Sequence, residues 1–171
     1  MNANEKTHTI SVLVENEFGV LARIASMFAG RGFNIDALSV APSPDPKTSR
    51  MTIITRGNDP IIEQILKQLN RLIDVIKVVD VSSQECVRRE LMLVKVKVHD
   101  KNRESLMQII QNFSGKIADA DDSKTMVLEF VGEHDEMGTI LNVLREQEFE
   151  ILESVSTGNI AIQKGKNVLS A

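Results

Sequence analysis

Apolar positions first alternate and then adopt a helical spacing near the N-terminus. Ile10, Val12 and Val14 occupy every second position, a pattern typical of a half-buried strand, which we place at residues 9–15. After a short polar stretch the apolar residues recur with the i, i+3, i+4, i+7 spacing of a helix that lies on a sheet. This spacing predicts a helix over residues 20–31, with a buried stripe of Leu21, Ile24, Ala25 and Phe28.

The rest of the first half predicts one further helix and three strands. We expect strands at residues 34–41, 49–56 and 75–81 and a helix at residues 60–72. Asp59 followed by Pro60 marks the start of that helix, because a carboxylate caps a helix and proline fits its first turn. The resulting βαββαβ order is the ferredoxin-like arrangement of the α+β class, an antiparallel sheet with both helices on one face.

The second half repeats this order. Apolar patterns predict strands at residues 91–98, 116–120, 125–131 and 149–155, with helices at 106–113 and 137–144. The chain is therefore expected to hold two ferredoxin-like domains, at residues 1–81 and 87–171, joined by a polar linker at residues 82–86. Ile160-Ala161-Ile162 predicts a short additional strand near the C-terminus.

Composition excludes several classes of function. A net charge of −4 argues against nucleic acid as the main partner, because phosphate contacts need a basic face. No apolar run approaches the roughly 20 residues of a membrane-spanning helix. The single cysteine, Cys86, excludes an internal disulfide and fits a reducing, cytoplasmic location. The three histidines are scattered and have no companion ligands, so no metal site is expected.

Two asparagines flank the first predicted helix and suggest a site for a free amino acid. Asn16 lies where the chain leaves the first strand, Gly19 precedes the helix, and Asn34 lies where the chain returns to the sheet. A helix start directs unpaired N–H groups at a small anion, and amide side chains can orient such a ligand. A purely local role is the alternative: Asn16 caps the helix, Gly19 makes the turn, and Asn34 takes a positive φ.

Several runs resemble a known family. The stretch N-E-F-G-V-L-A-R-I from position 16, followed by R-G-F-N-I from position 31, resembles the opening of an ACT domain. L-S-V-A-P at position 38, S-R-M-T-I at 49, Q-I-L-K-Q-L-N-R-L-I-D-V at 64 and V-R-R-E-L-M-L-V-K-V at 87 are similar to the small, regulatory subunits of acetolactate synthase. The similarity is strongest over residues 8–97 and continues more loosely to about residue 165.

This resemblance implies a regulatory subunit without catalytic residues. Such a subunit activates a separate large catalytic subunit, which carries thiamine diphosphate, Mg²⁺ and FAD, and it transmits feedback inhibition by valine or a related branched-chain amino acid. The resemblance also implies a homodimer or larger assembly, with the effector bound between two ACT domains. The implied effector-binding residues are Asn16, Gly19, Val20, Leu21, Asn34 and Ile35.

Two other functions remain open at this stage. One is a free-standing ACT-type sensor that regulates another enzyme or a transcription factor, although no helix-turn-helix or basic patch is present. The other is a small ferredoxin-like enzyme, which is disfavoured because no nucleophile or acid–base pair stands out.

Overall fold

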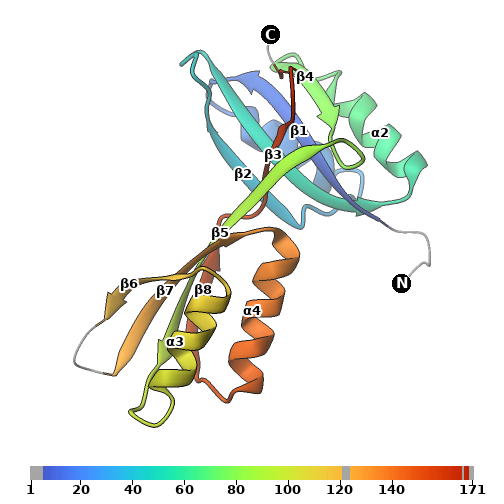
Figure 1. The fold of residues 1–171 in the computed structure, drawn as a ribbon. Coiled ribbons are helices and arrows are strands. Elements are labelled where there is room, and N and C mark those ends of the chain that lie inside the picture. Colours follow the sequence, from blue (N-terminus) through green and yellow to red (C-terminus); the bar gives the residue numbers. More distant parts are fainter. Residues whose placement is uncertain (1–5, 121–123, 167, 170–171) are drawn as a thin grey trace. The chain divides into compact units, whose positions relative to one another are not determined.

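The computed structural model describes residues 6–120, 124–166 and 168–169. The chain divides into two compact units, one formed by residues 1–87 together with 160–171 and the other by residues 88–159. Each unit is built on an antiparallel sheet with two helices in βαββαβ order (Figure 1). The predicted fold class, two ferredoxin-like domains, is therefore confirmed.

Unit 1 has a four-stranded sheet in the order β2-β3-β1-β4. The central strand β1 pairs along its whole length with β3, and β2 forms one edge of the sheet. In chain order the elements are β1 (Lys6–Glu15), α1 (Val20–Ala29), β2 (Ala37–Pro42), β3 (Thr48–Gly57), α2 (Asp59–Leu69) and β4 (Val75–Asp80).

The core of unit 1 lies between this sheet and its two helices. The three alternating residues that predicted the first strand are fully buried there, at 0% exposure each. Helix α1 contributes Val20, Ile24, Met27 and Phe28, whereas Leu21 and Ala25 are exposed. The predicted stripe was therefore wrong at those two positions, because the helix is rotated so that Val20 and Met27 face the sheet.

The opposite face of the same sheet is covered as well. Ser11 and Leu13 lie on this face and are 0% and 4% exposed. The Arg50 guanidinium donates from Nη2 to the carbonyl of Ala161 at 2.9 Å and to Ser11 Oγ at 3.3 Å. Burial lowers the pKa of Arg50 from its usual value, although Cys86 acts in the opposite direction. The segment that contains Ala161 is therefore part of unit 1.

Unit 2 repeats the order with a sheet of β6-β7-β5-β8, and β9 also pairs with β5. Its core gathers the apolar faces of both helices on the inner face of the sheet. The elements that follow β4 in the chain are β5 (Cys86–Lys97), α3 (Arg103–Asn112), β6 (Lys116–Ala120), β7 (Thr125–Gly132), α4 (His134–Glu146), β8 (Ile151–Ser156) and β9 (Ile160–Gln163).

The predicted extra strand near the C-terminus exists as β9, but it groups with unit 1 rather than with the C-terminal domain expected over residues 87–171. Ala161 packs with Val81 and Cys86 in a small apolar cluster. The backbone N–H of Lys164 also donates to the carbonyl of Glu85 at 2.9 Å. These contacts, together with the Arg50 hydrogen bond, attach residues 160–164 to unit 1.

A polar cluster ties the end of β4 to β1. Asp80 Oδ2 lies 2.9 Å from His8 Nδ1, and Asp80 Oδ1 accepts a hydrogen bond from the Ser82 backbone N–H at 2.9 Å. The Ser82 hydroxyl donates to the same oxygen. Burial acts to raise the pKa of Asp80, but the hydrogen bonds from Ser82 and the contact with His8 outweigh it, so the pKa lies below its usual value.

We expect Asp80→Asn to lower the free energy of unfolding at neutral pH by about 1–2 kcal/mol, because the amide replaces a charged acceptor. A lowered pKa stabilises the fold above the unfolded-state value of about 3.9, and this stabilisation is lost as the pH falls through the folded-state pKa. The variant should therefore lose less stability than the wild type between about pH 5 and pH 2. Urea unfolding followed by circular dichroism measures both effects. Asp100→Asn, at an exposed loop position, is the control. If the free energy of unfolding of Asp80→Asn depends on pH in the same way as that of the wild type, the assignment of a lowered pKa to Asp80 is wrong.

Candidate functional site

The predicted site begins at the turn between β1 and α1. Gly19 is the N-cap of α1 and has φ 84° and ψ −7°, in the left-handed region that favours glycine. No side chain of the described residues caps this helix, and its first turn contains no acidic residue. The first helical hydrogen bond runs from the Arg23 N–H to the Gly19 carbonyl at 2.9 Å. The N–H groups of Val20, Leu21 and Ala22 therefore precede the helical ladder and can bind an anion.

Asn16 supports this turn from the side. Its backbone N–H donates to the Lys47 carbonyl at 2.7 Å, and its Nδ2 donates to the Pro46 carbonyl at 3.0 Å. Its Oδ1 accepts a hydrogen bond from Ser49 Oγ at 3.0 Å. Asn16 thus joins the turn to the β2–β3 hairpin and does not cap α1. The alternative in which Asn16 is the helix cap is wrong, because the hairpin uses its side chain.

A partly buried ion pair lies beside the helix start. Arg23 Nε donates to Asp74 Oδ2 at 2.6 Å, and Asp74 is only 7% exposed. A Cβ built on Gly19 would lie 3.2 Å from Arg23 Nη1, so the guanidinium lies beside the turn. The sequence reasoning missed both residues of this pair. Arg23 follows Gly19 by one helical turn, and this spacing could have identified Arg23 as a site residue. No sequence pattern near Asp74 indicates that it belongs to the site.

Two neighbouring side chains differ in what they offer a ligand. Val20 is 3% exposed and belongs to the core, so only its backbone N–H can reach a ligand. Leu21 is 42% exposed and can contact an apolar ligand side chain directly.

Asn34 and Ile35 lie elsewhere. Asn34 Nδ2 donates to Asp36 Oδ1 at 2.7 Å, and the Asn34 carbonyl accepts a hydrogen bond from Thr55 Oγ1 at 2.6 Å. Ile35 is partly buried against the core of unit 1. Strand β2 begins at Ala37 rather than at residue 34, and Asn34 has no positive φ. The predicted strand start was wrong, and so was the positive φ that the local alternative gave to Asn34.

The register of β3 separates the two groups of site residues. Asn16 is bonded to Ser49 and Asn34 to Thr55, six residues further along the same strand. At about 3.3 Å per residue these anchor points are roughly 20 Å apart. One chain therefore brings together Asn16, Gly19, Val20 and Leu21, while Asn34 and Ile35 lie at the opposite end of the sheet.

Two general features of the described residues bear on function. None of the helices is long and apolar enough to cross a membrane. No group of three or more histidine, cysteine, aspartate or glutamate side chains in this part of the chain is arranged to hold a metal ion.

Family models match both units of the chain. Residues 10–77 match a model described as the AHAS small subunit-like ACT domain, and residues 89–165 match one described as the small subunit of acetolactate synthase. The two matches follow the division into two ferredoxin-like folds and together span most of the sequence.

Full-length relatives and a solved structure agree with these models. The acetolactate synthase small subunit of Haemophilus influenzae is 41% identical over 161 residues, which is 94% of this chain and 98% of that protein. The probable small subunit of Methanothermobacter thermautotrophicus is 42% identical over 164 residues, 95% of this chain and 96% of that protein. The crystal structure of the acetolactate synthase small subunit from Thermotoga maritima has a TM-score of 0.84 at 34% identity and covers 95% of this chain and 99% of that one.

Proposed function

The chain belongs to the family of acetolactate synthase small subunits, and we propose that it regulates a large catalytic subunit of that enzyme. In this role it raises the activity of the catalytic subunit and transmits feedback inhibition by valine or another branched-chain amino acid. The chemistry, with thiamine diphosphate, Mg²⁺ and FAD, belongs to the catalytic subunit. The single observation that carries the proposal is the similarity to small subunits over both units of the chain.

The purified chain alone should form no acetolactate from pyruvate in the presence of thiamine diphosphate, Mg²⁺ and FAD. Addition of this chain to the catalytic subunit of the same organism should raise the rate of acetolactate formation, and added valine should lower it again. The colorimetric assay for acetolactate measures all three conditions. Robust turnover by the isolated chain, or no change in the rate of the catalytic subunit, would remove the proposal.

We place the effector at the start of α1, where the amides of Val20, Leu21 and Ala22 and the Arg23 guanidinium can bind its carboxylate. A helix start contributes about 0.3–1 kcal/mol to such a ligand, up to ~2 when partly buried. Binding in the millimolar to micromolar range needs about 4–8 kcal/mol. Burial of a valine side chain adds about 1.5–3 kcal/mol, so a second surface must close the pocket.

A second protomer supplies that surface if the β2 edges of two chains pair. In an antiparallel, two-fold pairing the N-terminal end of one β2 lies beside the C-terminal end of the other. Asn34 precedes the N-terminal end, whereas Pro42 at the C-terminal end pairs with Ser49, the residue bonded to Asn16. The pairing would place Asn34 and Ile35 of one protomer opposite Asn16 and Leu21 of its partner. Effector binding would then depend on the geometry of the dimer, as an allosteric site requires.

Val40→Lys should weaken the homodimer. Val40 lies on the edge strand β2 and is 44% exposed in the single chain, so a pairing of two β2 edges would bury it, and two lysines would then meet across the two-fold axis. Sedimentation equilibrium should show a dissociation constant at least about tenfold higher than that of the wild type. Ile73→Lys is the matched control, because Ile73 is 93% exposed and lies outside β2. A wild-type chain that is a monomer at micromolar concentration would exclude the shared pocket.

Gly19→Asp should abolish feedback inhibition while it largely spares activation of the catalytic subunit. The new carboxylate would lie beside Arg23 and compete with the carboxylate of the effector, and a residue other than glycine is strained at φ 84°. Calorimetric titration with valine, leucine and isoleucine should show binding of the best ligand weakened about tenfold or more.

Two variants separate the charge from other effects of this substitution. Gly19→Ala introduces the backbone strain without the charge. Gly165→Asp introduces strain and charge at a glycine with φ 77° that has no atom within 4 Å of an added Cβ. Both should retain more of the effector binding than Gly19→Asp. If Gly19→Asp binds the effector as tightly as the wild type, the site lies elsewhere and the turn has only a structural role.

A further inference from the structure

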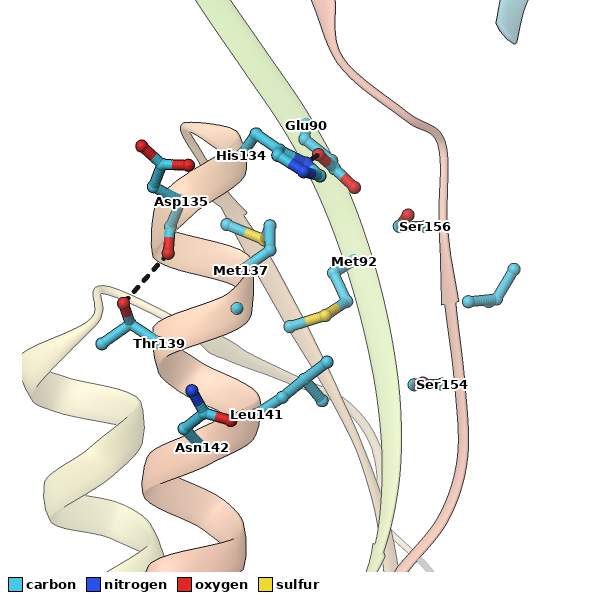
Figure 2. Close-up of a pocket in the computed structure, with 12 residues that line it drawn as sticks. Glu90, Met92, His134, Asp135, Met137, Thr139, Leu141, Asn142, Ser154 and Ser156 are labelled. Carbon is cyan, nitrogen blue, oxygen red and sulfur yellow. Dashed lines mark hydrogen bonds and ion pairs between the residues drawn. The ribbon is translucent and has the colours of Figure 1, made fainter. Parts of the chain in front are cut away.

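A groove of about 500 Å³ lies in unit 2 between helix α4 and the edge strand β8 (Figure 2). Met92, Met137 and Leu141 form its apolar floor, and Met92 and Met137 are 2% and 4% exposed. The hydroxyl side chains of Ser154 and Ser156 line it from β8. The groove shares no residue with the effector site proposed above.

One end of the groove is acidic. Glu90 is 3% exposed, and its Oε2 lies 2.7 Å from Nδ1 of His134, whose side chain is 63% exposed. Asp135, in the first turn of α4, adds a second carboxylate to the lining. The described lining residues include no lysine or arginine. Glu90 already contacts His134, so a cationic group placed at this end would meet the Asp135 carboxylate without displacing a lysine or arginine of the lining.

The strand beside the groove has an open edge. The Thr157 N–H donates to the Leu91 carbonyl at 3.0 Å, and Val155 and Glu153 stand opposite Leu93 and Lys95 in the ladder. Because bonded residues alternate along an antiparallel pair, the backbone groups of Ser154 and Ser156 point away from β5. Sheet order places β8 at the margin of the sheet in the described part of unit 2. Strand β8 carries no proline, lysine or arginine that would hinder pairing with another strand.

We propose that this groove binds an extended segment of the catalytic subunit by strand addition to β8. The segment would pair with the backbone of Ser154 and Ser156 and place an apolar side chain over the methionine floor. A lysine or arginine further along the segment would reach Asp135, beside the Glu90–His134 pair. The inference rests on the proposed function, which supplies the catalytic subunit as the partner, and it assigns the surface that this partner contacts.

Charge argues against a second copy of this chain as the occupant. The only charged residue of β8 is Glu153, so two β8 strands paired with one another would offer no cation to the acidic end of either groove. Like charges on paired strands are destabilising. A partner segment that carries a cation matches the groove, whereas another β8 does not.

Two matched pairs of variants test the groove. Gly138 lies on α4, lines the groove and has nothing within 4 Å of an added Cβ. Gly138→Arg fills the groove and places a cation near its acidic end, whereas Gly138→Ala does neither. Ser154→Pro removes an outward N–H from the open edge, a position where proline is tolerated, whereas Ser154→Ala removes only the hydroxyl. Circular dichroism and calorimetric binding of valine establish that each variant is folded and that its effector site is intact.

Binding of the purified catalytic subunit from the same organism to each variant is measured by biolayer interferometry. We expect Gly138→Arg and Ser154→Pro to bind about tenfold or more weakly, and the two alanine variants to bind like the wild type. Wild-type affinity in all four variants would overturn the inference and leave the proposed function standing. Altered self-association in sedimentation with unchanged affinity for the catalytic subunit would also overturn it, because the occupant would then be a second copy. A wild-type chain that neither binds nor activates the catalytic subunit would remove the proposed function and this inference together.

Discussion

The register of β3 is the constraint on which the proposed effector site depends. This strand pairs with β1 on one side and with β2 on the other, and its residues anchor Asn16 at one end and Asn34 at the other. A sheet holds these ends apart, because neither strand can shift by one residue without turning its core side chains to the opposite face. The two halves of the proposed site would therefore meet only across a pair of chains. The fold of a single subunit therefore makes the proposed regulation depend on assembly.

Helices α1 and α3 start without a side-chain cap, whereas α2 and α4 are capped. Helix α2 begins after Asn58, whose side chain accepts a hydrogen bond from the Ile61 N–H at 3.1 Å, and α4 begins with a capping box formed by Glu133 and Glu136. A side-chain cap contributes about 0.5–2 kcal/mol to stability, and α1 lacks this contribution because Gly19 has no capping side chain. The open amides and the nearby Arg23 are then available to a ligand. Local rules of helix design are commonly broken at functional sites.

The two units share one order of elements but cover their sheets differently. In unit 1 the face away from the helices is closed by residues 160–164, with Arg50 bonded to the carbonyl of Ala161. In unit 2 the strand β8 ends the sheet in the described residues, and a groove remains between it and α4. The first arrangement keeps most of the central strands β1 and β3 buried on both faces, and the second leaves a polar backbone edge beside an apolar floor. The repeat of a fold therefore does not imply a repeat of its surfaces.

The sequence by itself determined the elements and their order, because alternation and helical spacing depend on residues within a few positions of one another. It also identified Gly19, with φ 84°, as the turn before α1. Other features were decided only by the tertiary structure. The pairing of Arg23 with Asp74, the hydrogen bonds of Asn16 to the hairpin and the attachment of residues 160–164 to unit 1 all join residues far apart in the chain. Such contacts depend on strand register and packing, which no local pattern contains.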